Sequence, residues 1–123
     1  MSKPTYVQFF SEFGNEDVGL VGGKNASLGE MYQKLSGQGV RVPNGFATTS
    51  DAYRYVLKES GAVGALHEAL DDLDPSDVKD LARRAKRARE IVYGSAIPKD
   101  LADEIIAGYR KLQEEYGLSL IHI

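Results

Sequence analysis

Two glycines followed directly by a lysine are the residues of this sequence that could bind an anion. Gly22-Gly23-Lys24-Asn25 stands where an extended segment is expected to turn into a helix. The start of a helix offers unpaired backbone N–H groups and the positive end of the helix dipole, and both attract phosphate. The glycines let the backbone approach a ligand closely, and Lys24 adds a mobile positive charge. We therefore predict a phosphate contact at Gly22, Gly23 and Lys24.

A purely structural interpretation of the same residues stays open at this point. The glycines could form a plain turn into the helix, and Lys24 could be a solvated surface lysine. The pattern is not a Walker A loop, because that loop requires a glycine at the position of Val18 and a serine or threonine at the position of Asn25. A nucleotidase of the P-loop class is therefore not expected.

The two histidines, His67 and His122, have no neighbours that would make them reactive or metal-binding. His67 falls in the helical stretch Ala65–Leu70, where we expect a partly exposed histidine without a chemical role. The aspartates between Asp71 and Asp80 lack the glycine and the terminal glutamate of an EF-hand loop, so helix capping explains them better. No catalytic residue and no metal ligand is assigned to the chain.

Basic residues gather in one short segment. They are Arg83, Arg84, Lys86, Arg87 and Arg89. Apolar residues such as Leu81, Ala85 and Ile91 alternate with them at helical spacing, which indicates the solvated face of an amphipathic helix rather than a nucleic-acid strip. The whole chain has 15 basic and 18 acidic residues and a net charge of −3, so we expect no nucleic-acid partner.

The elements around the glycines can be read from the hydrophobic pattern. Tyr6–Phe10 is short, aromatic and β-branched, which indicates a strand or an extended lead-in. After the glycines, Leu28, Met31 and Leu35 recur at helical spacing and predict the apolar face of a short helix. A turn at residues 43–45 should then separate two extended pieces.

The second half of the sequence is typical of helices. Thr49 or Ser50 should cap a helix over about residues 51–60. Asp74 can cap another helix, which has Pro75 at its first position and runs towards Tyr93. A last helix follows residues 97–100, with Leu101, Ile105, Leu112 and Tyr116 on one face and Gly117 as its stop. We expect the last two helices to form a hairpin, and the chain to form one compact, helix-dominated α+β unit.

Composition is that of an ordinary globular domain. The 123 residues are 42% hydrophobic, which suffices for one domain with a modest core. Cysteine is absent, which excludes disulfides and cysteine nucleophiles and fits a reducing cytosol. The first residues lack a secretory pattern, and no segment approaches the roughly 18 apolar residues of a membrane span. We expect a cytoplasmic protein without a membrane partner.

Two longer stretches resemble a known family. Val21–Met31 reads Val-Gly-Gly-Lys-Asn-Ala-Ser-Leu-Gly-Glu-Met, and Gly39–Thr49 reads Gly-Val-Arg-Val-Pro-Asn-Gly-Phe-Ala-Thr-Thr. Both stretches and their spacing resemble the opening of phosphoenolpyruvate synthases. The wider group also contains pyruvate phosphate dikinases and rifampicin phosphotransferases. Asn25, Ser27 and the Ala47-Thr48-Thr49 ending are most similar to the synthase branch.

The resemblance implies a fold and a function. The fold would be the N-terminal part of an ATP-grasp-like nucleotide-binding domain, in which Lys24 matches a family lysine that contacts ATP phosphates. Phosphoenolpyruvate synthases use ATP, water and Mg²⁺ to convert pyruvate to phosphoenolpyruvate, and release AMP and phosphate. The implied partners are ATP, pyruvate and the remainder of the same polypeptide. The family's phosphate-binding arginine, metal ligands and phosphocarrier histidine have no match here, so we expect the chain alone to be inactive.

The resemblance also suggests how the chain is divided. Residues 1–117 would be a truncated portion of the family's ATP-binding domain. Leu118–Ile123 is similar to a translated sequencing adapter, and we expect this tail to be non-native. Two alternatives remain for function: a fragment of a pyruvate phosphate dikinase or rifampicin phosphotransferase, or a non-catalytic helical binding module.

Overall fold

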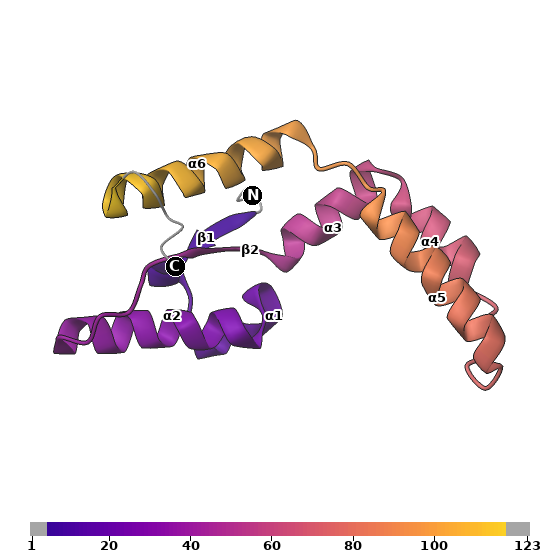
Figure 1. Cartoon of the computed structure of the whole chain (residues 1–123), viewed down its shortest axis with the longest axis horizontal. Helices are drawn as coiled ribbons and strands as arrows, with labels where there is room; N and C mark the ends of the chain where they lie inside the picture. The colour runs from indigo at the N-terminus through magenta and orange to yellow at the C-terminus, as the bar shows by residue number, and fades with distance from the viewer. Residues whose placement is uncertain (1–4, 118–123) are drawn as a thin grey trace. The chain divides into compact units, whose positions relative to one another are not determined.

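The computed structural model describes residues 5–117, which divide into two compact units rather than the single unit expected. The first unit combines the segment up to Tyr53 with the segment from Lys99 onward, and the second unit is Arg54–Pro98. Along the chain the elements are β1 (Val7–Phe9), η1 (Phe10–Glu12), η2 (Asn15–Asp17), α1 (Val18–Val21), α2 (Gly23–Leu35), η3 (Ser36–Gln38), β2 (Phe46–Thr48), α3 (Ser50–Glu59), α4 (Ala62–Leu70), α5 (Val78–Tyr93) and α6 (Lys99–Tyr116) (Figure 1). The expected helix-dominated α+β composition is confirmed.

The first unit is built around a two-stranded antiparallel sheet. β1 and β2 pair with Val7 opposite Thr48 and Phe9 opposite Phe46. The strand predicted over Tyr6–Phe10 is therefore confirmed in its centre, whereas the piece before the turn at residues 43–45 is not a strand. The sheet lies between α2 and α6 in Figure 1, so one helix of the unit covers each face.

Aromatic side chains cover the face of the sheet towards α6. The rings of Phe9 and Phe46 lie 5.7 Å apart between centroids, and Lys111 of α6 places its Nζ 4.6 Å from the centroid of the Phe9 ring. Leu101 and Leu112 of α6 are buried, as their predicted apolar face requires. This face of the sheet is thus closed by the last helix of the chain.

The end of α6 is tied to the turn that precedes β2. The backbone N–H of Asn44 donates to Oη of Tyr116 at 2.6 Å, and Nδ2 of Asn44 donates to Oε2 of Glu115 at 2.9 Å. Gly117 then has φ 93°, a left-handed value that ends the helix as predicted. Residues about 70 positions apart in sequence therefore meet inside the first unit.

The opposite face of the sheet carries the core of the first unit. Its buried members are Phe10, Phe13, Val21, Ala26 and Ala47. Phe13 is only 2% exposed and packs edge-on against the Phe10 ring, with 5.8 Å between the centroids. The core is small and aromatic, and it lies between β2 and the first half of α2.

The apolar face predicted for α2 is wrong. Leu28 and Met31 are 37% and 40% exposed, and Leu35 is only half-buried. The buried residues of α2 are Ala26 and Gly29. Small side chains face inward because the helix backbone lies directly against the segment that precedes it, where a leucine would not fit.

The closest approach lies between Gly29 and Phe13. A Cβ atom at Gly29 would lie 2.4 Å from the backbone oxygen of Phe13 and 2.7 Å from its ring. One turn later, Nε2 of Gln33 donates to the carbonyl oxygens of Phe10 and Phe13 at 3.0 and 2.6 Å. The helix is thus fixed to this segment both by contact and by hydrogen bonds.

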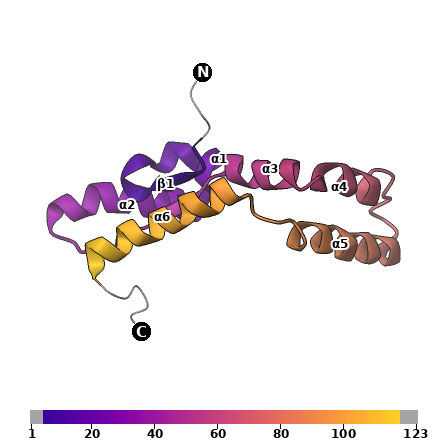
Figure 2. The ribbon, with the colours of Figure 1, turned by 90° about the horizontal axis from the view of Figure 1, so that it is seen from above.

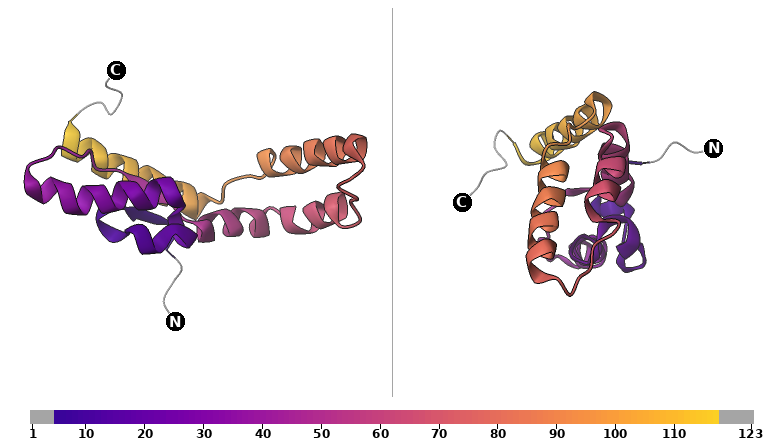
Figure 3. Two further views of the ribbon diagram at one scale, coloured as in Figure 1. Left: turned by 90° about the horizontal axis from the view of Figure 1, so that it is seen from below. Right: turned by 90° about the vertical axis from the view of Figure 1, so that its right-hand side faces the viewer.

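The second unit contains most of α3 and the helical pair α4 and α5. The side-chain oxygen of Thr49 accepts from the N–H of Ala52 at 3.2 Å, which confirms the predicted cap of α3. α4 and α5 pack side by side (Figures 2 and 3). The hairpin predicted between α5 and the following helix is therefore wrong, because α5 pairs with α4 and α6 belongs to the first unit.

α5 begins later than predicted. Its cap is Asp77, whose Oδ1 accepts from the N–H of Asp80 at 3.1 Å. The carboxylate of Asp74 instead accepts from the N–H and the hydroxyl of Ser76 at 2.9 and 2.7 Å. Asp74 and Pro75 form a local turn, because the carboxylate of Asp74 accepts hydrogen bonds from Ser76 instead of capping the helix.

We predict that Gly29→Ala destabilises the chain by about 1–3 kcal/mol, because the added methyl group overlaps the backbone of Phe13. Urea denaturation would measure this change. Gly64→Ala is the matched control, since Gly64 lies within α4 with no atom near its would-be Cβ. The control should keep or raise stability, as alanine favours the helix. Equal stability of the two variants would contradict the packing described for α2.

We also predict an acid-sensitive contribution from Glu30. The Lys34 ammonium and the N–H of Asn15, which donates at 3.1 Å, lower the pKa of Glu30 below its ordinary value of 4.5. The stabilisation should be fully present above about pH 4.5 and lost as the pH falls through the lowered pKa. Urea denaturation between pH 3 and 7 should show a weaker pH dependence for Glu30→Gln. An unchanged pH dependence would exclude this contribution.

Candidate functional site

Gly22 interrupts what would otherwise be one long helix from α1 into α2. It has φ 85° and ψ 159°, a conformation that is essentially confined to glycine. Its N–H donates to the carbonyl oxygen of Val18 at 2.8 Å, and its own carbonyl oxygen accepts from the N–H of Ala26 at 2.9 Å. Gly22 therefore closes α1 and opens α2 at the same residue.

The break leaves three successive amides without acceptors. The N–H groups of Gly23, Lys24 and Asn25 make no hydrogen bond with any residue between 5 and 117, and no side chain caps the start of α2. Gly23 and Lys24 are exposed, and the Lys24 ammonium has no ion-pair partner in the same range. The structure thus brings Gly22, Gly23 and Lys24 together at the positive end of a 13-residue helix.

Such an arrangement suits an anion with several oxygens. Aligned backbone N–H groups can donate to one phosphate group, while the flexible lysine reaches another oxygen of the same or the next phosphate. These residues fit the phosphates of a nucleotide. Nothing in the arrangement supplies a nucleophile or a general base.

Two side chains at this break were not assigned their roles from the sequence. Nδ2 of Asn25 donates to the carbonyl oxygen of Val21 at 2.9 Å. Oγ of Ser50, considered above only as a cap for α3, donates to the carbonyl oxygen of Gly19 at 3.0 Å. Asparagine is a poor helix former, and its position in the first turn of α2 was the available signal.

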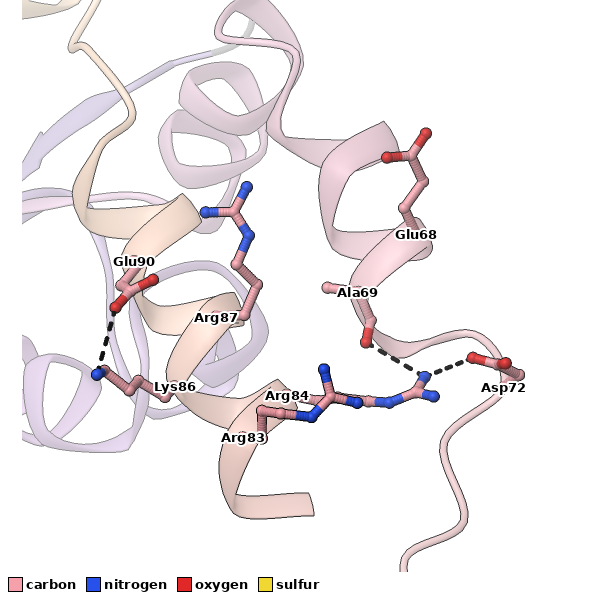
Figure 4. Close-up of a pocket in the computed structure, with 8 residues that line it drawn as sticks. All are labelled: Glu68, Ala69, Asp72, Arg83, Arg84, Lys86, Arg87 and Glu90. Atoms are coloured by element: carbon pink, nitrogen blue, oxygen red, sulfur yellow. Dashed lines mark hydrogen bonds and ion pairs between the residues drawn. The ribbon is translucent and has the colours of Figure 1, made fainter. Parts of the chain in front are cut away.

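The second unit has a surface hollow of about 630 Å³ between α4 and α5 (Figure 4). Its charged lining is largely paired. Arg84 bonds to the carboxylates of Asp72 and Asp80, the latter at 2.8 Å, and also reaches the carbonyl oxygen of Ala69 at 3.5 Å. The hydrogen bond from Arg84 holds the pKa of Asp72 below its ordinary value. Arg84 is therefore already engaged by carboxylates and is not available as a ligand contact.

The basic segment of α5 is a solvated helix face, as predicted, except at Arg84, whose side chain is only 18% exposed. Arg83, Lys86, Arg87 and Arg89 are exposed, and Arg83 pairs with Asp80 one turn earlier. Exposed pairs of this kind contribute less than about 1 kcal/mol. They make α5 soluble without forming a defined site.

His67 lies on the surface of α4. The side chain of His67 is 68% exposed on α4, where Nδ1 lies 3.0 Å from Oδ1 of Asp71, so the prediction of an exposed helix histidine is confirmed. His122 and the tail 118–123 lie outside the described residues. Between residues 5 and 117, no group of three or more histidine, aspartate or glutamate side chains could hold a metal ion. Residues 5–117 therefore contain no Mg²⁺ site built from three such side chains.

None of the helices between residues 5 and 117 combines the length with the apolar character needed to span a bilayer.

Comparison with known proteins agrees with a nucleotide-binding domain. The sequence profile of the pyruvate phosphate dikinase AMP/ATP-binding domain matches residues 18–123, and the chain belongs to this family. Within it, the chain is similar to proteins named phosphoenolpyruvate synthase: 46% identical over 113 residues to that of Helicobacter pylori, 45% over 111 residues to that of Synechocystis sp., and 42% over 109 residues to that of Escherichia coli K12. The resemblance predicted from the sequence is confirmed.

These matches cover the chain and the relatives to very different extents. They include 92%, 90% and 89% of this chain, but 14% of each relative. The chain therefore spans a small part of the length of the relatives it matches.

We predict that Gly22→Ala destabilises the chain by about 1–3 kcal/mol, because a Cβ atom is strained at φ 85° whatever space surrounds it. Gly23→Ala is the control, since Gly23 has no positive φ and open space around its would-be Cβ. Thermal or urea unfolding should show a loss for the first variant alone. Tolerance of alanine at Gly22 would argue against the helix break.

Proposed function

We propose that this chain contributes the first phosphate contacts of the ATP site in a phosphoenolpyruvate synthase. In that reaction ATP, water and pyruvate give phosphoenolpyruvate, AMP and phosphate. The observation that carries the proposal is the row of amides at Gly23, Lys24 and Asn25, which, like the adjacent Lys24 ammonium, have no partner among residues 5–117. Membership of an AMP/ATP-binding domain family supports ATP as the source of the phosphates.

The role of this chain would be binding and orientation. The amides and Lys24 would hold phosphate oxygens in place and offset their negative charge, which favours phosphoryl transfer without any bond being made by these residues. The chemical steps, and the Mg²⁺ ion that the reaction uses, would depend on groups outside this chain. We therefore expect activity only in a longer protein that contains this segment.

Phosphoenolpyruvate synthesis is preferred over the other reactions of the group. The three relatives compared above share that name and are 42–46% identical to the chain. Asn25, which distinguishes the synthase-like sequence, has a defined contact at the candidate site. A pyruvate phosphate dikinase or a rifampicin phosphotransferase would use the same phosphate contacts with a different acceptor.

We predict that Lys24→Ala weakens ATP binding by about tenfold or slows phosphoryl transfer to a similar degree, because it removes one charged contact to the phosphates. The measurement is calorimetric titration with ATP and Mg²⁺, together with turnover on pyruvate, in a protein of the relatives' length that contains this chain.

Lys34→Ala is the matched control for charge. Lys34 lies on the same helix, about 15 Å further along, and its ammonium pairs with Glu30 at the surface. This variant should bind ATP like the unchanged protein. Unchanged affinity and unchanged turnover in Lys24→Ala would refute the assignment of the site.

A further inference from the structure

We infer that Asn25 and Ser50 are positioning residues that hold the helix open at Gly22, so that the amides of α2 stay available to a ligand. The inference rests on the proposed function in one respect: the ligand is taken to be the phosphate group of a nucleotide. The hydrogen bonds themselves are independent of that assignment. Neither side chain is assigned a contact with the phosphates.

An unbroken helix would leave no amides free at this point. In a continuous α-helix each N–H donates to the carbonyl oxygen four residues earlier. The N–H groups of Gly23, Lys24 and Asn25 would then bond, in that order, to the carbonyl oxygens of Gly19, Leu20 and Val21. Breaking the helix releases these three N–H groups and deprives the three carbonyl oxygens of their donors.

The structure gives two of these three carbonyl oxygens, those of Gly19 and Val21, a side-chain donor instead. Ser50 Oγ donates to Gly19 at 3.0 Å, and Asn25 Nδ2 donates to Val21 at 2.9 Å. Val21 is 6% exposed, where a carbonyl group without a partner would cost about 1–3 kcal/mol. The two side chains thus replace two of the three lost helical bonds. The carbonyl oxygen of Leu20 receives no donor from residues 5–117.

The two donors come from different elements, which ties the break to the rest of the unit. Asn25 belongs to the first turn of α2 and bridges back across Gly22. Ser50 opens α3 directly after Thr49, whose N–H donates to Tyr6 at 3.0 Å and whose hydroxyl donates to Thr5 at 2.8 Å. The strand segment around β1 therefore fixes the position from which Ser50 reaches α1.

The test uses a protein of the relatives' length and compares four variants. Asn25→Leu and Ser50→Ala each remove one donor. Ser50→Thr keeps the hydroxyl group and should rescue binding. Ser95→Ala is the control, because Ser95 Oγ makes the same kind of bond, to the carbonyl oxygen of Ile91 at 2.9 Å, in the second unit.

Each donor-deleting variant should weaken ATP binding by about fivefold, which corresponds to one neutral hydrogen bond. Ser50→Thr and Ser95→Ala should bind ATP like the unchanged protein. Hydrogen exchange without nucleotide adds a readout that does not depend on function. The amides of Gly23, Lys24 and Asn25 should exchange without protection, and protection of these amides in the unliganded protein would overturn the inference.

The remaining outcomes separate this inference from the proposed function. If Lys24→Ala weakens ATP binding while Asn25→Leu and Ser50→Ala behave like Ser95→Ala, positioning by these side chains is wrong and the phosphate site stands. If Lys24→Ala also leaves ATP binding unchanged, the proposed function is wrong, and the inference falls with it.

Discussion

The close contact between α2 and the segment around Phe13 determines where the candidate site lies. Gly29 allows the helix backbone to touch Phe13, and Ala26 contributes only a small side chain to the same face. Hydrogen bonds from Gln33 then fix the rotation of the helix. Because the candidate phosphate contacts are at the first turn of α2, any shift of the helix along this contact would move them directly. The packing of small residues of α2 against Phe13 therefore also fixes the position of the candidate phosphate contacts.

The break at Gly22 requires no strained residue, because glycine adopts this backbone conformation without a Cβ clash. Side-chain donors reach two of the carbonyl oxygens that the break deprives of their helical partners, those of Gly19 and Val21. These two hydrogen bonds offset part of the cost of interrupting the helix. The main requirement of the break is therefore the backbone conformation of Gly22. That conformation also holds the N–H groups at the start of α2 in fixed positions.

Local signals in the sequence predicted local structure well. The glycine-opened helix, the Thr49 cap, the stop at Gly117 and the strand around Val7–Phe9 all depend on residues near one another in sequence. The errors came from contacts that periodicity cannot reveal. The spacing of Leu28 and Met31 predicted a buried helix face, but both side chains are exposed. The inward face of α2 instead contains Gly29, because only a residue without a side chain fits against Phe13.

The partner of α5 was likewise set by tertiary packing, not by sequence adjacency. At the candidate site, Gly22, Gly23 and Lys24 were found from their types and spacing. Ser50 was not, because its contact with Gly19 spans 31 positions. Family resemblance, read from two stretches, identified the chain more surely than any single contact could.

The tie between Asn44 and the end of α6 has a consequence for the order of synthesis. The first unit is discontinuous, and the contiguous segment Arg54–Pro98 is inserted within it. A ribosome releases that insert before it releases α6, so the insert can collapse while the sheet still lacks one of its covers. If the insert folds first, its two ends are less free to move. The loop that must close when α6 joins the first unit is then effectively shorter. The inserted helices would then make it easier for α6 to close the first unit.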